Sequence, residues 1–308
     1  MNLNPRWAVF IAVMCVGWSA IFIRWADDAH PFAIAFWRLV VACVFWLPLY
    51  WRDRRRDPRS LGTTQSRARL WAGFFLGIHF ILWITAFSYT TVASAVFLML
   101  TQPILSALGA HLFLGERLNR WNLVAIALTV IGSWIICQGD LALGPRYLMG
   151  DLLALAGAAA STAYLLMARV ARPARPGQRA LALGRYLAPV YISAMVACGV
   201  AMALAGVSFG PYGIQTWASM LALGVVCTVV GHSLFNYALG HLPAFSVNIA
   251  LVGEPVISSL LAWWLLAEPP TASMLAGALV LVSAIVFVLR WPPHNPLAAQ
   301  GGPATPLL

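Results

Sequence analysis

The sequence predicts an all-α membrane protein whose ten transmembrane helices form two inverted repeats of five helices (5+5). Three observations predict this fold class: the composition, the spacing of the apolar stretches and an internal repeat. Of the 308 residues, 61% are hydrophobic and 9% are charged, whereas a soluble domain carries about 25% charged residues. Because so few polar side chains cannot cover a folded chain in water, we expect the lipid bilayer to surround it.

Ten apolar stretches are each long enough to cross the hydrocarbon layer, which takes about 20 residues of α-helix. The first stretch is too long for the apolar core of a signal peptide, so it is expected to be a membrane helix. Residues 291–308 are rich in Pro, Gly and Ala and predict a disordered tail. The predicted helices span residues 7–25, 31–50, 70–88, 92–113, 121–138, 150–170, 185–205, 216–238, 246–266 and 272–290.

The basic residues indicate how the chain is oriented. All nineteen are arginines, and the formal net charge is +10. They cluster between apolar stretches, which is typical of the excess of positive charge in cytoplasmic loops and not of a face that binds nucleic acid. With a cytoplasmic N-terminus, sixteen arginines lie inside, and an even number of helices places the C-terminus inside as well. The outer loops then hold Asp27, Asp28, Asp140, Asp151 and Glu268.

An internal repeat appears when the sequence is shifted by 152 residues. The shift superposes Gln102-Pro103-Ile104-Leu105-Ser106 on Glu254-Pro255-Val256-Ile257-Ser258, without a gap. The same register aligns Glu116 with Glu268, so the pattern Pro-x12-Glu occurs in the fourth and the ninth predicted helix. Several matches in one register indicate that the second half of the chain repeats the first.

The repeat defines the expected domains. The first repeat is predicted over residues 1–140 and the second over residues 141–290. Because each contains an odd number of helices, the second must lie upside down relative to the first. Inverted repeats are typical of secondary transporters. A duplicated bundle that transports nothing is the alternative.

The tandem Pro-x12-Glu segments, the 5+5 plan and the opening Gly17-Trp18-Ser19-Ala20 resemble the drug/metabolite transporter superfamily, EamA family. The resemblance covers about residues 7–290, and within the family the chain is similar to the YddG-type exporters of aromatic and other neutral amino acids. It implies a central cavity lined mainly by helices 1, 3, 4, 6, 8 and 9, with helices 5 and 10 behind. It also implies a bacterial inner membrane location, and it assigns no catalytic residue.

Two prolines interrupt predicted helices at equivalent positions of the repeat. Pro103 and Pro255 each remove a backbone donor and clash with the carbonyl four residues earlier, that of Met99 or Leu251. In lipid a freed carbonyl needs another partner, so such breaks usually face a cavity. We interpret both prolines as hinges, with a simple packing kink as the alternative.

Glu254 is the acid expected deepest in the bilayer. Gln102 is its counterpart in the first repeat, and each is followed four residues later by a serine, Ser106 or Ser258, on the same helix face. A lone carboxylate at this depth is costly unless it is paired or protonated, and an ionisable group in the membrane is a functional hypothesis. Proton coupling or binding of a substrate ammonium group competes with a purely structural role.

The remaining candidates for substrate binding are aromatic or hydrogen-bonding residues at similar depth. Thr228, His232 and Asn236 form an i, i+4, i+8 stripe on the eighth helix, and His79 lies four residues before Trp83 on the third. Aromatic faces with a few polar groups suit an amino acid or a flat organic cation. Ordinary helix packing is the better explanation of any single member, whereas the set as a whole favours a mixed polar and aromatic lining. The full set is Trp18, His79, Trp83, Met99, Gln102, Tyr164, His232, Asn236, Asn248 and Glu254.

The second and third helices each carry one further feature, an arginine and a pair of glycines. Arg38 lies inside the second helix, where it either extends its side chain to the outer surface, binds a substrate carboxylate or closes a gate with an acid. We assign it to a gate. Gly73-x-x-x-Gly77 predicts a close contact between helices and carries no chemistry.

The predicted function is export of small metabolites by alternating access, with aromatic or neutral amino acids as the favoured substrates. No Walker motif is present, so the solute gradient or a proton gradient must drive transport. Proton-coupled efflux of cationic drugs is the alternative, and a membrane scaffold is the alternative from a different class. The five cysteines have no metal-ligand spacing, and no nucleophile or acid pair is visible, so we expect no enzyme activity, cofactor or metal.

Overall fold

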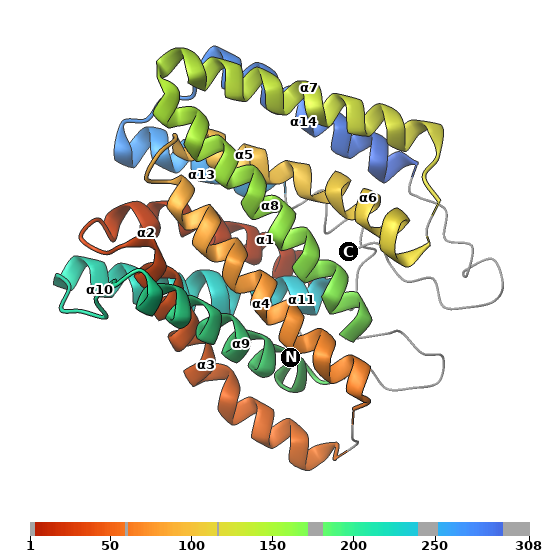
Figure 1. Ribbon diagram of the computed structural model, residues 1–308, viewed down its shortest axis with the longest axis vertical. Helices are drawn as coiled ribbons and strands as arrows, with labels where there is room; N and C mark the ends of the chain where they lie inside the picture. The colour runs from red at the N-terminus through yellow and green to blue at the C-terminus, as the bar shows by residue number, and fades with distance from the viewer. Residues whose placement is uncertain (1–3, 59–60, 116, 172–180, 240–251, 292–308) are drawn as a thin grey trace.

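The computed structural model describes residues 4–58, 61–115, 117–171, 181–239 and 252–291. Its helices run side by side in an elongated bundle (Figure 1). In the described part of the chain, nine spans of 19 to 27 residues are long and apolar enough to cross a membrane, and α13 (Gly253–Leu266) is a shorter apolar helix. The prediction of an all-α membrane protein with ten helices is confirmed. The ninth predicted helix, 246–266, begins outside the described residues.

The first repeat contains five membrane helices, two of which are interrupted. The first consists of α1 and α2, and the fourth of α5, a 3-10 turn (η1) and α6. The elements are α1 (Pro5–Gly17), α2 (Ser19–Trp25), α3 (Pro31–Arg56), α4 (Thr63–Ala86), α5 (Val92–Leu98), η1 (Met99–Thr101), α6 (Gln102–Leu114) and α7 (Arg120–Leu143).

The second repeat has the same order of helices. Its third membrane helix consists of α10, a π-helical segment (η2) and α11. The elements are α8 (Pro145–Ala171), α9 (Leu183–Leu204), α10 (Ile214–Ala222), η2 (Leu223–His232), α11 (Ser233–Leu239), α13 (Gly253–Leu266) and α14 (Ala272–Arg290).

The contacts of Thr90 show that the repeats have opposite orientations. Arg24, at the end of the first membrane helix, donates from Nη2 to the Thr90 carbonyl oxygen over 3.1 Å. The Thr90 hydroxyl lies 2.8 Å from Oδ1 of Asp151, near the beginning of α8. The first helix of repeat one therefore ends where the first helix of repeat two begins, as the odd number of helices predicts. We call this end of the bundle the Arg24 end.

Glycines allow the central helices to approach closely. A Cβ atom added to Gly73 would lie 2.3 Å from the Val190 carbonyl oxygen on α9, and one added to Gly77 would lie 2.9 Å from that of Ala194. The close contact predicted from Gly73-x-x-x-Gly77 is confirmed. α7 and α14 likewise pack against each other, with the rings of Trp121 and Trp291 stacked 4.6 Å apart.

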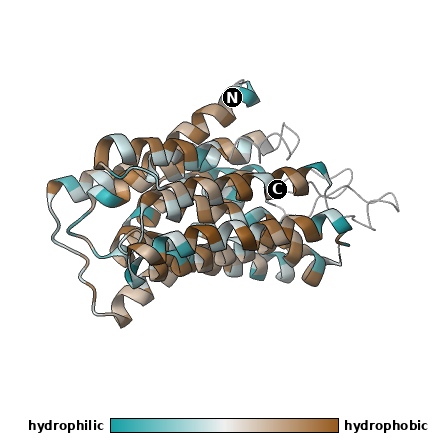
Figure 2. Ribbon diagram, turned by 90° about the horizontal axis from the view of Figure 1, so that it is seen from above, coloured by the Kyte–Doolittle hydropathy of each residue, from teal (hydrophilic) through white to brown (hydrophobic). Residues whose placement is uncertain are grey.

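Hydrophobic residues run along most of the length of the helices, and hydrophilic residues gather towards helix ends and loops (Figure 2). Large side chains such as Trp264, Phe113 and Leu279 are exposed on different helices. Contiguous exposed apolar surface of this kind is expected where lipid replaces water as the solvent.

Candidate functional site

The centre of the bundle contains a buried arginine. Arg38 of α3 is 1% exposed. Its Nε donates to the Thr228 hydroxyl over 2.7 Å, and its Nη2 lies 3.4 Å from Nε2 of His232. Because a guanidinium only donates hydrogen bonds, Nε2 of His232 must accept. The alternative in which Arg38 extends to the outer surface is wrong, because helices of both repeats enclose its side chain.

The partners of Arg38 lie on the π-helical segment η2. The Thr228 hydroxyl accepts from Arg38 and donates to the Leu223 carbonyl oxygen over 3.1 Å, so both of its roles are used. A π-helix pairs backbone groups five residues apart instead of four, and such segments are frequent at functional sites. Sequence reasoning found the polar stripe of Thr228 and His232 but treated it as ordinary α-helix.

Aromatic residues of α4 lie on another side of Arg38. The guanidinium carbon is 4.1 Å from the centre of the Phe80 ring, a distance at which the ring attracts the cation. The neighbouring His79 ring stacks on Trp83 at 5.9 Å, and its Nδ1 lies 2.9 Å from the Gly157 carbonyl oxygen of α8. Since a carbonyl only accepts, Nδ1 carries the hydrogen. His79 thereby joins α4 to α8.

Besides the π-helical segment η2, helix breaks lie at both prolines and at one further position. Pro103 follows η1 at the start of α6, and Pro255 lies in the first turn of α13, so each begins a new helical segment rather than bending a continuous one. The third break, at Trp18 between α1 and α2, was not predicted. There the Ser258 hydroxyl donates to the Gly17 carbonyl oxygen over 2.9 Å.

The other predicted lining residues are placed as follows. Glu254 lies in the first turn of α13 and interacts electrostatically with Arg38. The Trp18 ring stacks on that of Phe22 at 5.7 Å. Asn248 lies outside the described residues, as does Glu116, and nothing is described of the Asn236 side chain. Three further candidates are partly exposed on α8, η1 and α6: Tyr164, Met99 and Gln102.

A buried pair of acids at the Arg24 end was missed. Asp140 and Asp151, which the sequence analysis assigned to outer loops, are only 1% and 0% exposed because they lie within α7 and α8. Their Oδ2 and Oδ1 atoms lie 3.1 and 2.8 Å from the single Thr90 hydroxyl. Three residues from separate helices or loops meet here, so no local sequence pattern identifies the cluster.

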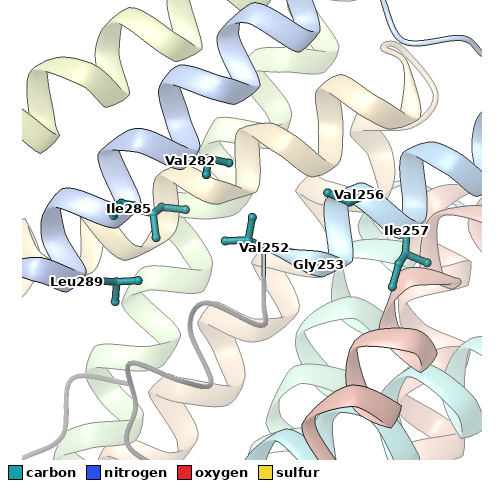
Figure 3. Close-up of a pocket in the computed structure, with 8 residues that line it drawn as sticks. Val252, Gly253, Val256, Ile257, Val282, Ile285 and Leu289 are labelled. Atoms are coloured by element: carbon teal, nitrogen blue, oxygen red, sulfur yellow. The ribbon is translucent and has the colours of Figure 1, made fainter.

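A cavity of about 410 Å³ opens between α13 and α14 (Figure 3). Its lining offers no polar side chain, so it suits hydrocarbon better than an amino acid. It is separate from the residues that contact Arg38. The lining residues are Val252, Gly253, Val256, Ile257, Val282, Ile285, Val286 and Leu289.

A bundle of inverted repeats with interrupted helices and a buried charged centre defines a multi-pass membrane transporter. The model of the EamA-like transporter family matches residues 6–138 and again residues 148–290, and the chain belongs to this family. It is therefore a transporter and not an enzyme.

Several relatives are similar over much of their length. The chain is 25% identical to a riboflavin transporter of Brucella anthropi over 290 residues, covering 90% of this chain and 95% of the relative. It is 27% identical to a probable amino-acid metabolite efflux pump of Escherichia coli, covering 60% and 63%, and 28% identical to the inner membrane protein YtfF of Escherichia coli, covering 64% and 67%. A solved crystal structure with 17% identity shares the fold at a TM-score of 0.60, covering 92% of this chain and 96% of the other.

Proposed function

We propose that this chain exports aromatic or neutral amino acids from a bacterial cytoplasm by alternating access between its two repeats. The observation that carries the proposal is the composition of the polar centre around the buried Arg38. Arg38 and Phe80 come from the first repeat, whereas Thr228, His232 and Glu254 come from the second. A site divided between two halves opens to either side when the halves rotate against each other.

The charges of this centre favour an amino acid over a cationic drug. A free amino acid carries a carboxylate and an ammonium group; Arg38 offers a buried guanidinium for the first and Glu254 offers carboxyl oxygens for the second. A purely cationic molecule brings no anion of its own to pair with the buried guanidinium. The relative named an amino-acid metabolite efflux pump points to the same class of substrate.

The orientation of the chain in the membrane follows from the end of the bundle where arginines cluster. Arg185 donates to the Asp57 carbonyl oxygen over 2.6 Å, and Arg69 donates to the Arg185 carbonyl oxygen over 2.9 Å. The positive-inside bias assigns this end, and with it both termini, to the cytoplasmic side of the inner membrane. The relative YtfF is named an inner membrane protein.

The movement is assigned to the interrupted helices. Pro103 and Pro255 act as hinges, because each begins a helical segment next to a break and cannot restore the lost backbone hydrogen bond. The repeats 1–140 and 141–290 are the moving bodies. Substrate contacts are assigned to the aromatic and polar candidates named above, with Asn236 and Asn248 among them.

Transport in liposomes tests this function. Purified protein should exchange labelled phenylalanine, tryptophan or leucine across the membrane faster than empty liposomes, and a cationic dye should not compete. Riboflavin belongs in the same panel because of the relative that bears its name. Transport of the dye without transport of any amino acid would contradict the proposal and indicate a cationic substrate.

A pH gradient in the same assay addresses proton coupling. Glu254 is the candidate proton carrier, since it is the acid that interacts with Arg38. If a gradient accelerates exchange in the wild type but not in Glu254→Gln, the acid couples transport to protons. An unchanged pH response in Glu254→Gln removes that role from Glu254.

A further inference from the structure

We propose that Arg38 is the residue that binds the carboxylate of the transported substrate, through its Nη1 atom. This inference rests on the proposed function and narrows its substrate class to molecules that carry a carboxylate. Within the part of the chain that the structure describes, three properties of Arg38 support it: one unpaired nitrogen, no acid in ion-pair contact, and a side chain held rigidly from three sides.

The first property is the unsatisfied donor. Nε contacts Thr228 and Nη2 contacts His232, whereas Nη1 is buried and has no hydrogen-bond partner among the described residues. Buried polar atoms are nearly always paired, and an unpaired donor on a charged group is especially costly away from water. A buried site of this kind is therefore completed by a ligand that accepts hydrogen bonds.

The second property is the missing counter-ion. Among the described residues, the ion pairs of arginine are Arg24 with Glu268, Arg52 with Asp53 and Arg185 with Asp57. Glu254 interacts with Arg38 electrostatically without forming such a pair. A positive charge in a low-dielectric interior needs a nearby anion, so the missing ligand should be negatively charged.

The third property is the fixed orientation of the guanidinium group. Phe80 covers its face at 4.1 Å, and Thr228 holds Nε from η2. The group therefore cannot turn away without breaking contacts to both repeats, and Nη1 is left as the donor for a ligand. A carboxylate oxygen forms short, charge-assisted hydrogen bonds with such a donor. Glu254 remains available for the ammonium group of the same substrate.

Analogues that lack one charged group test the inference in wild-type protein. Phenylalanine uptake is measured in competition with 3-phenylpropionate, which keeps only the carboxylate, and with phenylalaninamide and phenethylamine, which lack it. We expect 3-phenylpropionate to compete at least about tenfold better than either amine, because a site built for a hydrogen-bonded group rejects analogues without it. Equal competition by phenylalanine and phenylalaninamide would overturn the carboxylate role while leaving amino acid transport intact.

Substitutions then test whether Arg38 causes the preference for analogues that carry a carboxylate. Arg38→Gln should lose the preference for 3-phenylpropionate, and Arg38→Lys should retain part of it because it keeps a positive donor. Arg146→Gln is the matched control, since it removes an exposed arginine near the Arg24 end. Retention of the full preference in Arg38→Gln assigns carboxylate recognition to another residue.

Binding without transport separates this inference from the proposed function. Purified protein in nanodiscs is heated with and without 3-phenylpropionate, and unfolding is followed by fluorescence. The probe should raise the unfolding temperature of wild type and Arg146→Gln, but not of Arg38→Gln, even if no amino acid is transported. An equal shift in all three proteins, or none in wild type, contradicts a carboxylate site at Arg38.

Discussion

The Arg24 guanidinium and the Glu268 carboxylate form an ion pair at 2.9 Å. Arg24 is near the end of the first membrane helix, and Glu268 follows α13, so the pair joins the two repeats. Arg24 also donates to the Thr90 carbonyl oxygen, and the second Glu268 oxygen accepts from the Val92 amide over 3.0 Å. Any movement that separates the repeats at this end must break the contacts of Glu268 with Arg24 and Val92.

Removing the charge of Glu268 should loosen the Arg24 end. Both side chains are more than a quarter exposed, so the ion pair contributes no more than about 1 kcal/mol. Glu268→Gln should therefore shift the balance towards separated repeats by about fivefold or less. The measurement is the labelling rate of a cysteine placed at Ala93 in a cysteine-free background. Asp27→Asn, in a nearby loop, is the control, and equal rates in both variants would show that the pair does not hold the repeats together.

Replacing Gly73 by alanine should destabilise the bundle. The new Cβ would lie 2.3 Å from the Val190 backbone oxygen and 2.5 Å from the Ser193 side chain. Overpacking of this kind costs about 1–3 kcal/mol, which exceeds the gain of up to about 1 kcal/mol in helix propensity. Thermal unfolding in detergent measures the change. Gly62→Ala, whose nearest atom lies at 4.0 Å, should be close to neutral, and equal unfolding temperatures for the two variants would contradict close packing at Gly73.

One proton should be shared within the cluster of Thr90, Asp140 and Asp151. The single hydroxyl hydrogen serves only one of the two acids, so the other contact is a hydrogen bond only if that acid is protonated. Asp151→Asn imitates the protonated form and should change stability little, by about 1 kcal/mol or less. Thr90→Val leaves both acids without the hydroxyl and should cost about 1–3 kcal/mol. Thermal unfolding at neutral pH compares them, and the reverse order of stability would refute a shared proton.

Stability should depend on pH through Asp28 in the loop between α2 and α3. Its Oδ2 accepts from the Gly213 amide over 2.6 Å, and hydrogen bonds from Thr216 and Gly213 hold the pKa of Asp28 below its ordinary value of 3.8. Because the folded pKa is the lower one, the stabilisation is present above the ordinary value and is lost as the pH falls through the folded pKa. Asp28→Asn should thus unfold at a lower temperature than wild type at pH 7.

Acidification should then remove this difference. Unfolding temperatures of wild type and Asp28→Asn are measured from neutral pH down to below the ordinary pKa of 3.8. The unfolding temperatures of wild type and Asp28→Asn should become equal at the most acidic pH. The difference between wild type and the control Asp27→Asn should stay the same at every pH. A difference in unfolding temperature between wild type and Asp28→Asn that does not change with pH would show that the carboxylate charge does not stabilise this loop.

The helix breaks show what a local sequence pattern can and cannot predict. Their chemistry indicated that the fourth and ninth helices are interrupted, and new helical segments do begin at Gln102 and Gly253. No proline marks the breaks at Trp18 and at η2. They depend on partners from elsewhere in the chain, such as the Ser258 hydroxyl that satisfies the Gly17 carbonyl oxygen. A break stabilised by a distant side chain leaves no signal in its own segment.

The sequence by itself determined the membrane class, the number of helices and the opposite orientation of the repeats. Hydrophobic length is a local property, and lipid requires each spanning segment to satisfy its own backbone. Only the tertiary structure decided which groups meet. Thr228 lies 190 residues from Arg38, and Asp140 and Asp151 lie 50 and 61 residues from Thr90. Such encounters depend on how the helices pack and rotate, which the apolar periodicity of each helix does not specify.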